Sequence, residues 1–157
     1  GAARVDVAVV NGSLHGYEIK SARDTLERLP KQSELYSSVF DTITLVTAEN
    51  HLDGALSVIP DWWGIVLARK ERKTLKLSLV RETKPNNAVD PMALAELLWK
   101  EEALGLLQER DAAEGYLSKP RREIWKAVCE IYSTQELREA VRLFLKRRST
   151  LLERKLI

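Results

Sequence analysis

The sequence predicts an α/β protein with a mixed β-sheet core flanked by helices, followed by an all-helical C-terminal extension. Two observations predict this class. Before residue 85, short runs rich in Val, Ile and Leu alternate with segments of helical periodicity, in the order β-β-α-β-α-β-β. Beyond residue 88, nearly every segment has the spacing of an amphipathic helix. We therefore expect an α/β core over residues 1–84 and a helical extension over residues 88–157.

The first expected element is a β-hairpin. Residues 4–10 (RVDVAVV) are rich in Val, and residues 16–20 (GYEIK) return as a second strand. Between them, Asn11-Gly12 is a dipeptide typical of a tight turn. The chain should therefore reverse near Gly12.

Helices and strands then alternate. Ser21 can cap a helix that continues to Leu29, and after Pro30 the helical spacing resumes over residues 31–40. Further strands are expected at residues 42–47, 64–68 and 75–80, with a short helix at 51–59. In the extension, Asp90 should cap a helix that begins at Pro91.

Composition excludes several classes of protein. The chain has 157 residues, of which 45% are hydrophobic and 31% charged, as in an ordinary globular protein. No apolar run approaches the roughly 20 residues that cross a bilayer, so we expect no membrane partner and a cytoplasmic location. Because the chain has one Cys and two His, carboxylates would have to hold any bound metal.

Charge is unevenly distributed along the chain. Residues 1–118 carry 14 Lys+Arg against 18 Asp+Glu, whereas residues 119–157 carry 11 against 5. In the last helix, Arg142 and Lys146 belong to a cationic stripe that could follow nucleic-acid phosphates. The alternative is that these good helix formers simply make a soluble surface.

The residues that indicate chemistry lie near the hairpin. In a strand, residues two apart point to the same face, so Glu18 and Lys20 project together. An odd-numbered loop centred on Gly12 would place Asp6 opposite Glu18 on that face. Two carboxylates suit Mg²⁺ or Mn²⁺, and a lysine beside them can balance charge on a phosphoryl group. The geometry suggests phosphodiester hydrolysis.

These residues resemble the PD-(D/E)XK nuclease superfamily, which has the restriction-endonuclease-like fold. Asp6 and Glu18-Ile19-Lys20 match its Asp and (D/E)-x-K motifs, and Gln32 with Tyr36 matches the Gln-x-x-x-Tyr motif of its exonuclease branch. The resemblance implies that Asp6, Glu18 and the backbone carbonyl of Ile19 bind the metal and that Lys20 is catalytic. It also implies that Gln32 and Tyr36 shape the site and contact nucleic acid.

The whole chain also resembles an uncharacterised bacterial group of that superfamily, known by a locus-tag name. The shared segments are HGYEIKS at 15–21, PDWWG at 60–64, PMALAELLWKEEAL at 91–104 and KPRREIWK at 119–126. Superfamily members usually have a helix before the hairpin, and only three residues precede Arg4 here. We expect that this helix is missing, and that a homodimer or a partner chain could supply it.

The predicted function is a Mg²⁺- or Mn²⁺-dependent nuclease that acts on DNA, with RNA open as a substrate. Asp6, Glu18, Lys20, Gln32 and Tyr36 form the expected site. Near it, Arg28 and Lys31 could touch a DNA backbone, although solvated surface explains them equally well. The alternative function is a non-catalytic nucleic-acid-binding or assembly protein that uses the basic C-terminal helices. A lone Glu-x-Lys usually marks a solvated strand face, but here three motifs occur in the required order within residues 6–36.

Overall fold

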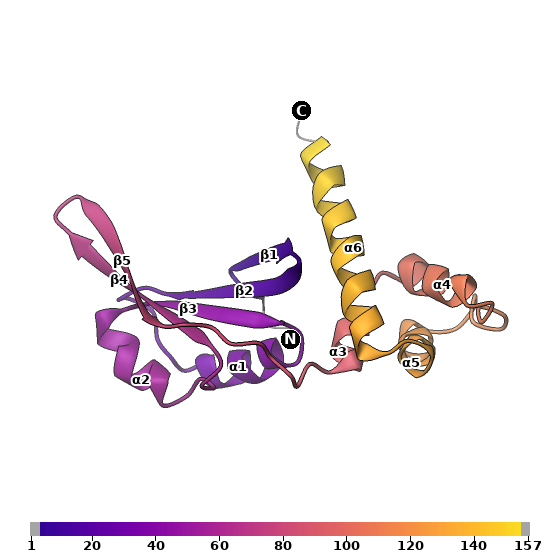
Figure 1. Ribbon diagram of the computed structural model, residues 1–157, viewed down its shortest axis with the longest axis horizontal. Coiled ribbons are helices and arrows are strands. Elements are labelled where there is room, and N and C mark those ends of the chain that lie inside the picture. Colours follow the sequence, from indigo (N-terminus) through magenta and orange to yellow (C-terminus); the bar gives the residue numbers. More distant parts are fainter. Residues whose placement is uncertain (1–3, 155–157) are drawn as a thin grey trace. The chain divides into compact units, whose positions relative to one another are not determined.

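The computed structural model describes residues 4–154, with side chains up to residue 149. The chain divides into two compact units, residues 1–88 and residues 89–157. Figure 1 shows that strands and two helices make up the first unit and that the second is helical.

A five-stranded mixed sheet forms the first unit, with its strands in chain order across the sheet. The outer pairs are antiparallel, and the two inner pairings, β2 with β3 and β3 with β4, are parallel. The expected element order is confirmed. The strands are β1 (Val7–Asn11), β2 (Ser13–Lys20), β3 (Thr42–Ala48), β4 (Gly64–Glu71) and β5 (Thr74–Arg81).

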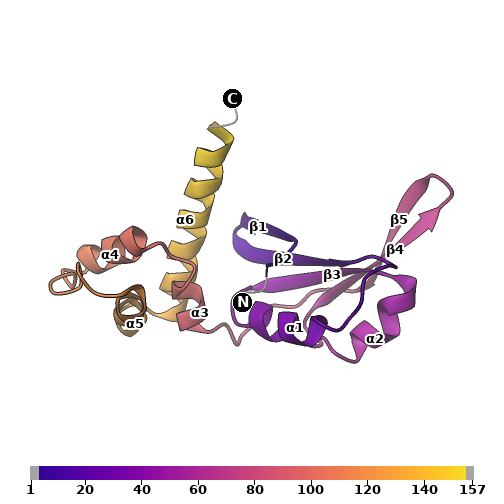
Figure 2. The same ribbon diagram turned by 180° about the vertical axis from the view of Figure 1, so that it is seen from behind.

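Helices α1 (Leu29–Ser37) and α2 (Leu52–Leu56) cross between the parallel strands, with a short 3-10 turn, η1 (Glu49–His51), before α2. Both crossovers advance in the same direction across the sheet, so right-handed connections place both helices on one face (Figures 1 and 2). The helix expected over residues 21–29 is wrong: residues 22–28 contain turns and bends, and α1 begins only at Leu29. Pro30 does not interrupt a helix but lies in the first turn of α1, where its missing N–H costs nothing.

The hairpin register decides which side chains of β2 face α1. Val7 pairs with Tyr17 and Ala8 with Gly16, so the turn is centred on Gly12, whose φ of 71° is in the region that glycine adopts without strain. Alternate residues of β2 are buried, and Glu18 and Lys20 are among them. They therefore project from the face of the sheet that α1 covers.

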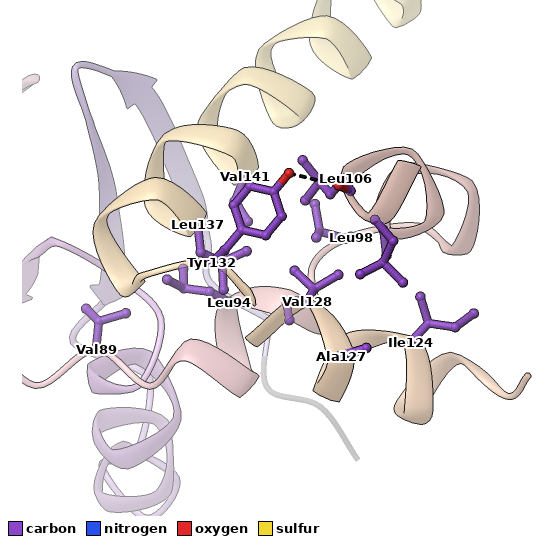
Figure 3. Packing of buried hydrophobic residues seen from close by; sticks show 13 residues of the cluster. Val89, Leu94, Leu98, Leu106, Ile124, Ala127, Val128, Tyr132, Leu137 and Val141 are labelled. Carbon is purple, nitrogen blue, oxygen red and sulfur yellow. Dashed lines mark hydrogen bonds between the residues drawn. The ribbon is translucent and has the colours of Figure 1, made fainter. Parts of the chain in front are cut away.

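The second unit is a helical cluster around its own core (Figure 3). Its described helices are α3 (Pro91–Ala95), α4 (Lys100–Glu109), α5 (Arg121–Ile131) and α6 (Thr134–Arg154). As expected, the Asp90 side chain caps α3 by accepting a hydrogen bond from the Met92 backbone N–H at 2.8 Å. Within the core, the Tyr132 hydroxyl donates to the Leu106 carbonyl at 2.8 Å, so the buried hydroxyl is satisfied. None of the described helices is both long and apolar enough to span a membrane.

Candidate functional site

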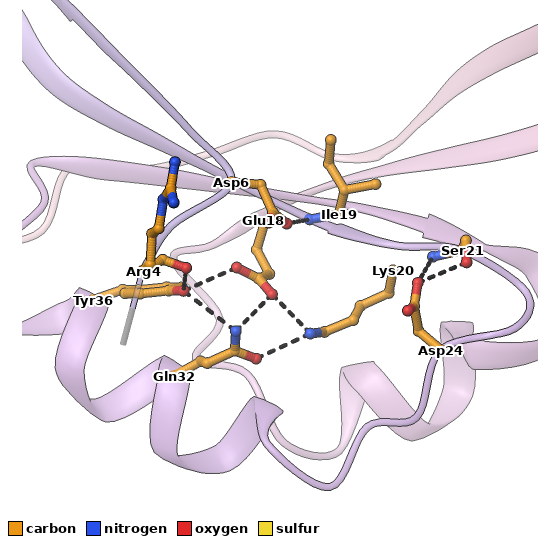
Figure 4. Close-up of polar contacts among 9 residues, drawn as sticks. All are labelled: Arg4, Asp6, Glu18, Ile19, Lys20, Ser21, Asp24, Gln32 and Tyr36. Carbon is orange, nitrogen blue, oxygen red and sulfur yellow. Dashed lines mark hydrogen bonds and ion pairs between the residues drawn. The ribbon is translucent and has the colours of Figure 1, made fainter. Parts of the chain in front are cut away.

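The residues expected to form a site come together at the end of β2 (Figure 4). Glu18 and Lys20 project from β2, whereas Gln32 and Tyr36 lie one turn apart on the facing side of α1. Asp6 lies one residue before the first strand. A hydrogen-bonded network joins the four residues of β2 and α1.

Glu18 is the centre of this network and is only 2% exposed. Its Oε1 accepts hydrogen bonds from Lys20 Nζ and Gln32 Nε2, both at 2.7 Å. Its Oε2 accepts from the Tyr36 hydroxyl at 3.0 Å. Since each carboxylate oxygen has about two lone-pair sites, Oε1 is saturated and Oε2 keeps one acceptor site.

Lys20 completes a buried ion pair with Glu18. Its ammonium group, on a residue 4% exposed, also donates to Gln32 Oε1 at 3.0 Å. The Gln32 amide therefore links both members of the pair, because its nitrogen donates to Glu18 and its oxygen accepts from Lys20. Burying two charges costs free energy that their attraction does not reliably return, so such a pair is weak evidence of stabilisation.

Tyr36 connects the network to the chain before β1. Its hydroxyl lies 3.0 Å from Glu18 Oε2 and 2.8 Å from the Arg4 carbonyl, so its single proton is shared between two acceptors. Burial, and after it the negative charge of Glu18, raise the pKa of the Tyr36 hydroxyl. The hydroxyl consequently stays protonated at neutral pH and remains a donor to the carboxylate.

The side chain of Asp6 contacts the backbone of β2. Asp6 Oδ2 accepts a hydrogen bond from the Ile19 N–H at 2.8 Å (Figure 4). The hairpin register, continued by one residue from the Val7–Tyr17 pair, places Asp6 opposite Glu18, as the odd-numbered loop predicted. Asp6 is exposed, whereas Glu18 is buried. The Asp6 carboxylate therefore lies on the solvent side of the site, and the Glu18 carboxylate lies on the side of the protein interior.

A small pocket of about 380 Å³ lies at this site. Asp6, Glu18, Ile19, Lys20 and Gln32 contribute to its lining. Three lining residues, Arg4, Val5 and Asp24, were absent from the predicted site, and two of them are charged.

Asp24 is held by a local turn that the sequence does contain. The backbone N–H and the hydroxyl of Ser21 each donate to Asp24 Oδ2 at 2.6 Å. These bonds, first the hydroxyl and then the backbone N–H, lower the pKa of the Asp24 carboxyl below its ordinary value. The Ser-x-x-Asp spacing directly after the second strand is the signal that could have placed a carboxylate here.

The cations expected to contact nucleic acid fall into different places. Arg28 lines the small pocket. Lys31 is exposed on α1 and is not among the residues that line the pocket. Arg142 and Lys146 belong to α6 of the second unit. The second strand was expected to begin at residue 16, but β2 already includes His15. His15 is half-buried, and its ring nitrogens lie 2.7 Å from Thr42 Oγ1 and 3.1 Å from Thr44 Oγ1.

The donor set fits a hard divalent cation with few protein ligands. Asp6 and the remaining acceptor site of Glu18 are carboxylate oxygens, which Mg²⁺ and Mn²⁺ prefer, and Mg²⁺ commonly binds one or two carboxylates and several waters. Among residues 4–149, no group of three His, Cys, Asp or Glu side chains comes together closely enough to make a complete protein cage. The residues present therefore suit a partly hydrated ion and not a fully liganded structural metal.

A larger groove of about 1070 Å³ adjoins the pocket. The two share Ile19 and Lys20 in their linings, and the groove continues past the ends of β3 and β4. Ligands of open α/β sheets commonly bind outside the carboxyl ends of parallel strands, which is where this groove lies. Its wall includes Ala48, the last residue of β3, and Arg69 and Lys70 in β4.

Comparisons with known proteins give one family. Residues 2–156 match the model of the family described as bacteriophage P4 protein cII. The curated protein cII of Enterobacteria phage P4 is 24% identical over 145 residues, which cover 92% of this chain and 54% of the phage protein. The chain thus spans about half the length of this curated relative. No solved structure matches the chain significantly.

Proposed function

We propose that this chain, which belongs to the bacteriophage P4 protein cII family, hydrolyses phosphodiester bonds of DNA with Mg²⁺ or Mn²⁺ at the pocket around Glu18 and Lys20. The observation that carries the proposal is that carboxylates and cations line this single pocket. Carboxylates suit a divalent cation, and guanidinium and ammonium groups suit a phosphate. The charged lining residues are Asp6, Glu18, Asp24, Arg4, Lys20 and Arg28.

The buried ion pair supports this proposal. Glu18 and Lys20 are 2% and 4% exposed, and an apolar pair of similar volume would fill the space without a desolvation penalty. Buried charges with specific partners cluster at functional sites, although structural networks can also contain them. Here the pair lies at the floor of a pocket that opens to solvent beside Asp6.

Each residue has a role that follows from its contacts. A divalent cation, when bound, would polarise the phosphate and lower the pKa of an attacking water. Asp6 and Glu18, with the backbone carbonyl of Ile19, would hold that cation. Gln32 and Tyr36 fix the Glu18 carboxylate through hydrogen bonds of 2.7 and 3.0 Å. Lys20 supplies a positive charge that can offset charge developing on the phosphate.

We include the fold in the same proposal and assign the first unit to the restriction-endonuclease-like class and the PD-(D/E)XK superfamily. The support is topological. The hairpin β1–β2 brings Asp6 beside Glu18, and α1 then supplies Gln32 and Tyr36 before β3 adds in parallel next to β2. A partner subunit that completes the site, whether a second copy or another chain, belongs to this proposal as an alternative.

The test is a cleavage assay on labelled single-stranded, duplex and branched DNA and on RNA, with Mg²⁺, Mn²⁺ or EDTA. We expect cutting that needs the metal and falls at least 100-fold in Asp6→Ala and Lys20→Ala, the range that one essential catalytic group contributes. Asp53→Ala, which removes an exposed carboxylate from α2, is the matched control and should cut normally. Circular dichroism shows whether each variant is folded, and Asp6→Asn tests the exposed carboxylate without a change in volume.

Binding without cutting would instead favour the non-catalytic alternative. In that case affinity for DNA should be indifferent to Lys20→Ala and should depend on Arg142 and Lys146 of α6. Metal-independent cutting, or full activity in Asp6→Ala, would refute the proposed site.

A further inference from the structure

The strongest concentration of charge in the first unit lies at the end of the β4–β5 hairpin. Residues 69–76 (RKERKTLK) contain five Lys and Arg and one Glu, and we call this segment the basic arm. The other residues of 1–88 carry seven basic and ten acidic side chains. The basic arm therefore has a net charge of +4, whereas the rest of this unit has a net charge of −3.

The basic arm extends beyond the sheet. The last residue of β4 that pairs with β3 is Ala68, whereas pairing with β5 continues from Arg69–Lys76 to Glu71–Thr74. Within residues 4–154, the arm is thus a two-stranded ribbon with no third strand beside it, and Figure 1 shows it projecting from the sheet. Every residue of the arm is exposed.

Three cations of the arm have no acidic partner among the described residues. Arg69 Nη2 lies 2.6 Å from Glu49 Oε1, and Lys76 Nζ lies 3.6 Å from Glu71 Oε1. The three cations without such a partner are Lys70, Arg72 and Lys73. They occupy the end of the ribbon, where neighbouring positive charges repel one another.

Two further features of the arm do not favour folding. Arg72 has a φ of 50°, a left-handed conformation that Gly or Asn adopts at lower cost. Leu75 is 66% exposed, and an isolated two-stranded ribbon is marginally stable in water. Charge repulsion, backbone strain and an exposed Leu occur together in the arm, and none of them stabilises the folded protein. Binding of a partner to the arm explains this combination better than a role in folding does.

We propose that the basic arm binds duplex DNA by placing its cationic end against the phosphates that border a groove. The B-DNA major groove, about 12 Å wide, admits a two-stranded β-ribbon, and cations along such a ribbon release counterions from the phosphates. Arg69 and Lys70 also line the large groove that shares Ile19 and Lys20 with the small pocket. The choice of DNA as the polyanion rests on the proposed function, and the arm would hold the duplex whose strand enters the pocket.

The test measures binding of a short fluorescent DNA duplex in EDTA, so that metal-dependent cutting does not contribute. The variant Lys70→Gln/Arg72→Gly/Lys73→Gln removes three cations, and Gly suits the positive φ at position 72. We expect binding to weaken about tenfold or more, and the slope of log affinity against log salt between about 50 and 200 mM to become shallower by roughly 2 to 3. The matched control, Arg121→Gln/Arg122→Gln/Lys126→Gln, removes three exposed cations from α5 and should bind like the wild type.

The other outcomes separate this proposal from the nuclease proposal. Equal affinity and equal salt slope in the arm variant and the wild type would overturn the arm as a DNA contact, even if the protein cuts DNA. No binding of the wild type to duplex DNA, or binding only to anionic lipid vesicles, would overturn it as well. Arm-dependent binding without metal-dependent cutting would support the arm and refute the nuclease.

Discussion

Removing the Lys20 ammonium group, as in Lys20→Met, should destabilise the first unit strongly. Lys20 Nζ lies 2.7 Å from Glu18 Oε1, and both residues are almost fully buried. The Met side chain fills a similar volume but leaves the Glu18 carboxylate without its counter-charge. Breaking a buried pair in this way typically costs about 3 to 5 kcal/mol. Since Gln32 and Tyr36 still donate to Glu18, we expect about 3 kcal/mol, the lower end of that range.

The companion variant Glu18→Gln/Lys20→Met separates charge from packing. With both charges removed, no uncompensated ion remains, and replacing a buried pair by neutral groups is often close to neutral in stability. The double variant should therefore be more stable than Lys20→Met alone, and the two substitutions should couple by about 2 to 3 kcal/mol.

Hydrogen exchange of the buried β3 and β4 amides, followed by mass spectrometry, measures this effect within the first unit. Leu45 and Ile65 lie in the central strands and are fully buried. A loss of about 3 kcal/mol should speed their exchange on the order of 100-fold. Exchange in Lys20→Met within a factor of about five of the wild type, or additive effects of the two substitutions, would refute the argument that Lys20 compensates a buried charge.

Three further predictions follow from the structure. Tyr36→Phe removes a donor to Glu18 and should lower the free energy of unfolding, measured by urea denaturation, by about 1 to 3 kcal/mol. The circular dichroism spectrum should stay that of the folded protein, and an unchanged urea midpoint would contradict the prediction. Burial lowers the pKa of His15, so the contribution of His15 to stability should be complete above its ordinary pKa of about 6.5 and should be lost as the pH falls through its lower folded pKa. Urea midpoints across about pH 5 to 8 should show this fall in the wild type and not in His15→Gln. Leu137→Ala, at a fully buried position of the helical unit, should cost about 2 to 5 kcal/mol by hydrogen exchange of α5 while leaving exchange of β3 unchanged; a similar loss in both units would contradict this.

The hydrogen bonds to Glu18 leave room for the proposed cation. Glu18 has one acceptor site left on Oε2, so a cation that binds there does so without displacing Lys20 or Gln32. Added Mg²⁺ should therefore stabilise the native state by mass action and restore part of the stability that Lys20→Met loses.

The sequence by itself determined the order of the elements and most of the candidate site. Apolar β-branched runs distinguish the strands, and Asn11-Gly12 marks the reversal of the chain. An odd-numbered loop centred on Gly12 predicted the register that places Asp6 opposite Glu18, and the structure has that register. The period of two within β2 put Glu18 and Lys20 on one face, and the spacing of four put Gln32 and Tyr36 on one side of a helix. Each of these inferences depends on local periodicity, which the sequence contains.

Only the tertiary structure decided what these residues contact. The turns over residues 22–28 replaced an expected helix because Ser21 bonds Asp24 locally, and this brought Asp24 and Arg28 to the pocket. The burial of Glu18 and Lys20, the pairing of Tyr36 with the Arg4 carbonyl, and the projection of residues 69–76 beyond β3 all depend on where separate elements pack. Such contacts join residues far apart in the chain, so no local pattern encodes them. The electrostatics of the site depend on how far each charged group is buried and on which charges lie beside it, and both are set only when α1 packs on the sheet.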